Sequence, residues 1–162
     1  MEKCVVCPGS YDPITLGHLD IIERASALFD KVIVVAMINH KKHYSFSTQE
    51  RVEMIKKTVS HLRNVEVDFS DGLLSDYAKE KNAYAIIKGL RAMSDFENEF
   101  QMALANKKLN PDVETLFLTT NSGFMYLSSS MVKQIAGMGG DISGFVPAVI
   151  HDDIIERLVN RD

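Results

Sequence analysis

Cysteine is scarce in this chain, with only Cys4 and Cys7 among the 162 residues. A C-x-x-C pair can mark a redox or metal site. A redox pair of that kind opens a helix, however, whereas these two cysteines lie in an apolar run typical of a strand. Residues i and i+3 of a strand point to opposite faces, and no second cysteine pair completes a zinc site. We therefore expect two reduced structural thiols.

The chain also lacks an excess of positive charge and any long hydrophobic run. Eighteen Lys and Arg against 22 Asp and Glu give a net charge of −4, which argues against a nucleic-acid-binding surface but leaves room for a local basic pocket. The longest apolar run, residues 32–38, is far shorter than the roughly 20 residues that span a bilayer. No secretory signal is visible near Met1. We expect a cytoplasmic protein with no nucleic-acid or membrane partner.

The sequence does contain a regular alternation of two kinds of segment. Apolar runs with the composition of buried strands alternate with segments of helical periodicity. The strands are expected at residues 3–7, 31–38, 65–69, 84–88 and 114–119. The intervening and following helices are expected at 15–29, from 47, at 73–81, 94–109, 128–136 and 147–158. This order predicts a doubly wound, Rossmann-like α/β fold with a five-stranded parallel sheet, in a single domain over residues 1–162.

Two of these helices have a predicted capping box at their start. Ser47-Thr-Gln-Glu50 and Ser94-Asp-Phe-Glu97 both place a hydroxyl three residues before a carboxylate. In that motif the serine accepts from the backbone of the third helical residue, and the glutamate reaches back to the cap.

The densest group of turn and polar residues follows the first expected strand. It reads Pro8-Gly9-Ser10-Tyr11-Asp12-Pro13-Ile14-Thr15-Leu16-Gly17-His18. Its Gly and Pro residues indicate a tight loop leading into a helix, whose free N–H groups can hold phosphate. Gly9 and Gly17 allow close approach of the backbone to a ligand. Ser10 adds a hydroxyl and His18 an imidazole. A Gly-His pair alone is more often a plain turn, but this density favours a phosphate-binding loop.

Two basic segments follow other expected strands at the same edge of the sheet. Lys41 and Lys42 come after residues 31–38, where a surface patch and a binding site are equally consistent with the pattern. Ile87-Lys88-Gly89-Leu90-Arg91 ends an apolar strand in two cations. It fits either an ordinary surface arginine or a phosphate clamp, in which Gly permits close approach and Arg offers forked donors.

A run of three hydroxyls, Ser128-Ser129-Ser130, begins the helix expected after the last strand. Serines in this position could only cap the helix. They could equally hold a triphosphate with side-chain and backbone donors.

Together these motifs resemble those of a known enzyme family. The stretch from Pro8 to His18 resembles the (T/S)-x-G-H region of the nucleotidyltransferase superfamily, and phosphopantetheine adenylyltransferase is the family it resembles most. Ile-Lys-Gly-Leu-Arg-Ala-x-x-Asp-Phe-Glu and Ser-Ser-Ser-x-Val-Lys are similar to further stretches of that family, in the same order. The family usually has Arg where Lys88 stands, which puts its grip on a phosphate in question.

The resemblance implies a reaction and a set of site residues. ATP and 4′-phosphopantetheine would give 3′-dephospho-coenzyme A and pyrophosphate, with Mg²⁺ bound to the ATP and no resident metal site. The implied catalytic residues are His18, Lys42 and Ser10. The implied acceptor-binding residues are Ser10, Lys42, Leu74 and Lys88. The implied ATP-binding residues are Ser10, Tyr11, His18, Gly89, Leu90, Arg91, Glu99, Phe124, Met125, Tyr126, Leu127, Ser128, Ser129 and Ser130. The family also implies a homohexamer.

Two other functions stay open at this stage. A sister nucleotidyltransferase would act on another phosphorylated acceptor, such as nicotinamide mononucleotide or glycerol phosphate. A nucleotide-sensing module would bind without turnover, although the presence of Ser10, His18, Lys42 and Arg91 speaks against it.

Overall fold

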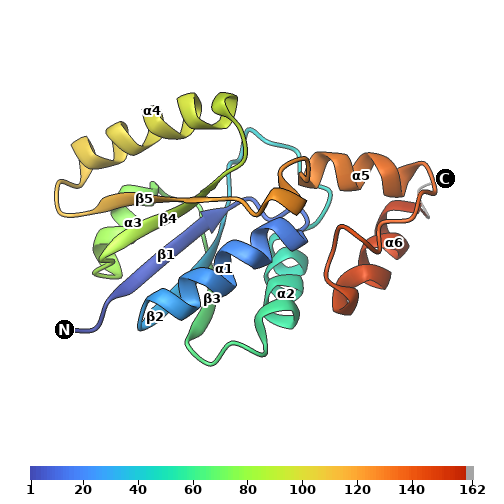
Figure 1. Cartoon of the computed structure of the whole chain (residues 1–162), viewed down its shortest axis with the longest axis horizontal. Helices are drawn as coiled ribbons and strands as arrows, with labels where there is room; N and C mark the ends of the chain where they lie inside the picture. The colour runs from blue at the N-terminus through green and yellow to red at the C-terminus, as the bar shows by residue number, and fades with distance from the viewer. Residues whose placement is uncertain (160–162) are drawn as a thin grey trace.

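The chain folds around a five-stranded sheet whose strands all run parallel (Figure 1). The computed structural model describes residues 1–159. The strand order is β3-β2-β1-β4-β5. The strands are β1 (Cys4–Gly9), β2 (Lys31–Met37), β3 (Val65–Ser70), β4 (Ala85–Leu90) and β5 (Glu114–Thr119). The predicted fold class is confirmed, and the chain reverses its direction of winding between β1 and β4, where α/β folds place their ligands.

Helices cover both faces of this sheet. The α-helices are α1 (Leu16–Leu28), α2 (Thr48–Val59), α3 (Leu74–Glu80), α4 (Met93–Leu109), α5 (Ser129–Gly137) and α6 (His151–Val159). Short 3₁₀ turns, η1 (Ser122–Phe124) and η2 (Ala148–Ile150), precede α5 and α6. None of the helices within residues 1–159 is long and apolar enough to cross a membrane.

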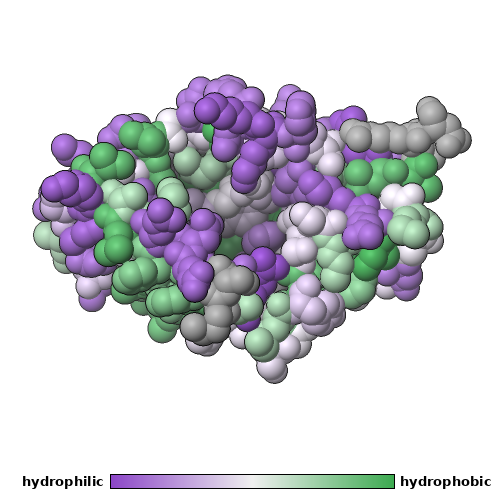
Figure 2. Space-filling view, turned by 90° about the horizontal axis from the view of Figure 1, so that it is seen from above, coloured by the Kyte–Doolittle hydropathy of each residue, from purple (hydrophilic) through white to green (hydrophobic). Residues whose placement is uncertain are grey.

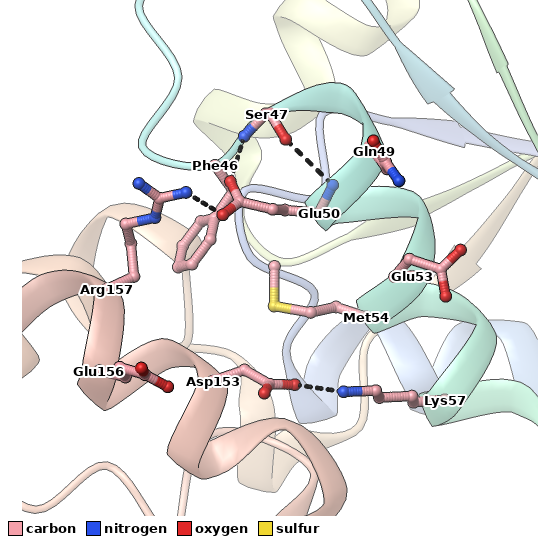
Figure 3. A pocket seen from close by; sticks show the side chains of 10 residues that line it. All are labelled: Phe46, Ser47, Gln49, Glu50, Glu53, Met54, Lys57, Asp153, Glu156 and Arg157. Carbon is pink, nitrogen blue, oxygen red and sulfur yellow. Dashed lines mark hydrogen bonds and ion pairs between the residues drawn. The ribbon is translucent and has the colours of Figure 1, made fainter.

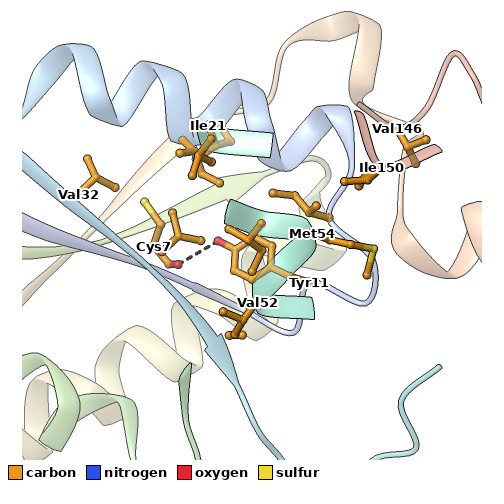
Figure 4. Close-up of a cluster of buried hydrophobic side chains, with 14 of the residues drawn as sticks. Cys7, Tyr11, Ile21, Val32, Val52, Met54, Val146 and Ile150 are labelled. Carbon is orange, nitrogen blue, oxygen red and sulfur yellow. Dashed lines mark hydrogen bonds between the residues drawn. The ribbon is translucent and has the colours of Figure 1, made fainter. Parts of the chain in front are cut away.

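Alternation along the strands divides the core between the two faces. Val5 and Cys7 of β1 pack in the large cluster formed with α1, α2, α5 and α6 (Figure 4). Val6, between them, packs on the other face with Tyr77 of α3. Because side chains of a strand alternate, Cys4 also lies on that second face. Cys4 and Cys7 are free thiols on opposite sides of the sheet, as predicted.

Helix α6 packs against α2 across a groove of about 750 Å³ (Figure 3). Ile154 of α6 is fully buried in the core. Lys57 and Asp153 form an ion pair across the groove at 2.8 Å, and Arg157 pairs with Glu50. The groove is therefore bridged by two ion pairs between α2 and α6.

Several element ends differ from the sequence predictions. Strands β1 and β4 run two residues further than predicted, to Gly9 and Leu90. These extra residues are still paired with the neighbouring parallel strands, β2 and β5 respectively. The capping box at Ser47 is confirmed. The one at Ser94 is wrong: α4 begins at Met93, and the cap position is Ala92, with no side-chain hydrogen bond. The last helix begins as η2 after Pro147 and becomes α-helical at His151.

Candidate active site

A pocket of about 430 Å³ lies at the carboxyl ends of the strands, where the loops after β1, β2, β4 and β5 meet. Seen from above, the molecule is hollowed near its middle, with hydrophilic side chains along much of the rim (Figure 2). The four sequence motifs, separated by up to 120 positions, thus contribute to one cavity.

Most of the implied site residues line this pocket. The set comprises Ser10, Tyr11, His18, Lys42, Lys88, Gly89, Arg91, Glu99, Phe124, Leu127, Ser128, Ser129 and Ser130. Leu90, Met125 and Tyr126 do not line it, and the last two are largely exposed. Leu74 lines a smaller cavity of about 110 Å³, which shares Lys88 and Glu99 with the main pocket.

His18 is held in one tautomer by the residue that caps its own helix. The backbone N–H of Thr15 donates to His18 Nδ1 at 3.0 Å, and the Thr15 hydroxyl caps α1. An Nδ1 that accepts a hydrogen bond carries no proton, so the proton of the neutral ring resides on Nε2. Burial, together with the positive charges of Arg91 and Lys88, lowers the pKa of His18 to about 4. The site therefore holds a neutral imidazole with one N–H available to a ligand.

The left-handed residue of the first loop is a tyrosine rather than a glycine. Tyr11 has φ 47°, whereas Gly9 and Gly17 have no positive φ. This conformation is unusual for a bulky residue. The Tyr11 hydroxyl donates to the Cys7 carbonyl at 2.9 Å, and its ring meets His18 edge-on at 5.0 Å. Its hydroxyl is thus engaged within the core, while the residue still lines the pocket.

Asp12 connects three segments around the pocket. Its carboxylate accepts from the N–H groups of Ser45 and Phe46, each at 3.0 Å, and pairs with Lys133 of α5 at 2.9 Å. The carboxylate is 6% exposed, so its hydrogen bonds are shielded from water. Asp12 therefore fixes the end of the Lys42 loop and the middle of α5 against the first loop.

The two cations after β4 are already paired. Lys88 Nζ lies 3.3 Å from a carboxylate oxygen of Glu99. Arg91 donates from Nε to Asp95 at 3.0 Å and from one terminal nitrogen to the Leu127 carbonyl at 2.7 Å. A guanidinium has five N–H groups, so Arg91 keeps donors for a phosphate. Gly89 serves packing: a Cβ there would lie 3.0 Å from Ile21 Cγ1.

The three serines of the second phosphate-binding candidate differ in their contacts. Ser128 caps α5 by accepting from the Met131 N–H, so the capping alternative holds for this residue. The Ser129 hydroxyl donates to the Pro13 carbonyl at 2.7 Å. Ser130 is exposed and faces the pocket. The first N–H groups of α5 have no partner inside the helix and can receive an anion.

Metal and thiol chemistry have little support from the side chains. Among residues 1–159, no group of three or more His, Cys, Asp or Glu is placed to hold a metal ion. The carboxylates in the pocket, Asp95 and Glu99, are paired with Arg91 and Lys88. Burial raises the pKa of Cys7 to about 12, so this thiol stays protonated.

Sequence reasoning missed three residues that hold the site together: Asp12, Thr15 and Arg51. Asp12 and Thr15 lie inside the first motif but had no assigned role. Thr15 begins a predicted helix, and threonine is a preferred cap, which was a usable signal. The contacts of Asp12 and Arg51 cross 121 and 41 positions respectively, and no local pattern predicts them.

Comparison with known proteins agrees with the fold and with the motifs. A family model described as cytidylyltransferase-like matches residues 6–135. The phosphopantetheine adenylyltransferase of Caldanaerobacter subterraneus subsp. tengcongensis is 56% identical over 96% of this chain and 97% of its own length. That of Clostridium tetani is 57% identical over 96% and 98%.

Solved structures agree at the level of the fold. A Plasmodium falciparum nicotinic acid mononucleotide adenylyltransferase, complexed with NaAD, superposes with a TM-score of 0.68 at 16% identity, covering 98% of this chain and 97% of that one. At such identity the likeness concerns the fold alone. The near-complete coverage and high identity of the sequence relatives go further, and the chain belongs to the phosphopantetheine adenylyltransferase family of nucleotidyltransferases.

Proposed function

We propose that this protein transfers the adenylyl group of ATP to the phosphate of 4′-phosphopantetheine, giving 3′-dephospho-coenzyme A and pyrophosphate. The observation that carries the proposal is the convergence of a neutral imidazole N–H, three cations and a helix N-terminus in one pocket. This arrangement suits two polyanions brought together, and family membership supports both substrates.

The chemistry needs no general base from the protein. The acceptor phosphate is already anionic near neutral pH, and one of its oxygens attacks the α-phosphorus of ATP. A new P–O bond forms, the bond to the β-phosphate oxygen breaks, and its electron pair leaves with pyrophosphate. The enzyme's contribution is to position the reactants and to stabilise charge developing on the α-phosphate.

Each basic group has a part in that scheme. His18 donates from Nε2 to an α-phosphate oxygen as charge builds. Lys42 bridges the two reacting phosphates, and Ser10 orients them. Lys88 exchanges part of its contact with Glu99 for the acceptor phosphate. Arg91 and the N-terminus of α5, with Ser129 and Ser130, receive the β- and γ-phosphates.

Mg²⁺ enters with ATP in this proposal. The pocket carboxylates are paired with cations, so phosphates and water supply most of the metal's ligands. The ion, when bound, neutralises charge on the triphosphate.

A homohexamer in the cytoplasm is also proposed. Association of copies is supported by apolar side chains exposed on α4 and β5, among them Phe100, Leu104 and Leu116. The free, protonated thiol of Cys7 suits a reducing compartment.

The test is pyrophosphate release from ATP with each acceptor in turn. We expect release only with 4′-phosphopantetheine. Release with nicotinamide mononucleotide alone would mean a sister nucleotidyltransferase, and ATP binding without release would mean a sensing module.

A further inference from the structure

Arg51 of α2 is a buried cation directly beneath the pocket. The residue is 1% exposed. One terminal nitrogen donates to the Ser10 carbonyl at 2.7 Å and to the Met37 carbonyl at 3.3 Å, and the other to the Thr48 hydroxyl at 3.3 Å. These hydrogen bonds go to two carbonyls and a hydroxyl rather than to a carboxylate, and Nε has no hydrogen-bond partner among the described residues.

The guanidinium also stacks on an aromatic ring. Its central carbon lies 4.0 Å from the centroid of the Tyr44 ring. The Tyr44 hydroxyl accepts from the Asn39 N–H at 2.8 Å, and the Asn39 carbonyl accepts from the Lys42 N–H at 2.9 Å. Arg51 thus lies under the turn that carries Lys42, and Tyr44 connects the two.

Burying a guanidinium without a carboxylate partner is costly, and an apolar side chain would fill the same position more stably. What Arg51 supplies that an apolar residue cannot is contact with two loops at once. It donates to the carbonyl of Ser10 in the first loop, and it supports the Lys42 loop through its contacts with Met37 and Tyr44. Ser10 and Lys42 both line the pocket.

We propose that Arg51, stacked on Tyr44, is a positioning residue that fixes Ser10 and Lys42 relative to each other for adenylyl transfer. It acts through these two residues and touches neither substrate. The planar fork is required because one terminal nitrogen reaches the Ser10 and Met37 carbonyls and the other reaches the Thr48 hydroxyl, while the guanidinium face lies on the Tyr44 ring. A lysine would keep the charge but lose the fork and the stacking geometry.

The inference rests on the proposed function and predicts a particular kinetic pattern. Arg51→Lys and Tyr44→Leu should each lower kcat by about 10- to 100-fold, because displacing a reacting group by about 1 Å has that effect. The KM for ATP should change less than about threefold, since Arg91 and α5 are untouched. Ile55→Val is the matched control: Ile55 is fully buried on the same helix, so the substitution lowers thermal stability without changing kcat.

A double-mutant cycle separates positioning from general support of the fold. In a Lys42→Ala background, Arg51→Lys should lower single-turnover pyrophosphate release by less than about threefold, because one of the two groups whose relative position it fixes is gone. In a His18→Ala background its full effect should persist, since Thr15 holds His18 independently.

Two kinetic results would overturn the proposal. One is an equal loss of pyrophosphate release on Arg51→Lys in the Lys42→Ala and His18→Ala backgrounds, and the other is an unchanged kcat in Arg51→Lys alone. If Arg51→Lys does not fold, Tyr44→Leu replaces it in the same double-mutant cycle. A wild-type protein that releases no pyrophosphate with 4′-phosphopantetheine would refute the proposed function instead.

Discussion

Replacing His18 by alanine tests the central feature of the site, a neutral imidazole fixed in one tautomer. The ring offers one N–H, from Nε2, because Thr15 donates to Nδ1 at 3.0 Å. Removing a single preorganised donor to transition-state charge costs about 2.7–4 kcal/mol, or about 10²–10³ in kcat. ATP affinity should change much less, because the contact strengthens only as charge develops.

The pH dependence makes this prediction sharper. With a pKa of about 4, His18 is neutral at every pH from 6 to 8.5. The ratio of wild-type to His18→Ala kcat should therefore stay constant across that range, measured as pyrophosphate release at saturating substrates. His61→Ala is a suitable control, because His61 is an exposed partner of Glu23.

The low pKa of His18 also makes the stability of the folded protein depend on pH, in a direction that can be stated. Below pH 6.5 the unfolded chain binds a proton at His18 that the folded protein does not bind until about pH 4. The free energy of unfolding should fall as pH drops through this window, by up to about 3 kcal/mol. His18→Ala should remove that part of the pH dependence.

For the kinetic test, an inflection near pH 6.5 in the ratio of wild-type to His18→Ala kcat would contradict the neutral-donor role. It would show that the imidazolium, or proton transfer by it, takes part in catalysis.

Three further predictions concern the pocket, the thiols and the α2–α6 groove. Lys88→Ala should raise the KM for 4′-phosphopantetheine far more than that for ATP, whereas Lys88→Arg should leave activity intact; an effect on ATP alone would mean that Lys88 contacts the nucleotide. The Cys4→Ser, Cys7→Ser double variant should keep kcat within a few-fold despite some loss of stability, and zinc in the purified wild-type protein would contradict this. Lys57→Ala should lower the melting temperature only slightly, because both partners of its pair with Asp153 are nearly half exposed. Its kcat should be unchanged, and a lowered kcat would make the groove part of the active site.

The sequence predicted the fold well because periodicity and composition report burial directly. β5 was predicted at the residues it occupies, Glu114–Thr119. The convergence of four motifs followed from parallel strands, whose carboxyl ends share one edge.

The internal contacts of the site were harder to predict. Gly9 and Gly17 were expected to allow close approach of a ligand, whereas nothing in the sequence pointed to Tyr11 as the residue with positive φ, stabilised by its hydrogen bond to Cys7. Gly89 stays a candidate for close approach of a phosphate, but the sequence did not indicate that its lack of a Cβ also accommodates Ile21. Packing and hydrogen-bonding roles of this kind depend on which side chains come into contact in the folded protein. Spacing along the sequence does not predict those contacts.

The hydrogen bonds of Asp12 bear on how the pocket opens. Loops usually fray separately, each with its own small opening free energy. Here one carboxylate ties the amides of Ser45 and Phe46 and the ammonium of Lys133 to the first loop. Releasing any one segment exposes a buried charge, so the three should open together as a single cooperative unit. The backbone amides of Ser45 and Phe46 should then exchange their hydrogens as slowly as those of the strands. The loops around the pocket should therefore open as rarely as the core of the protein does.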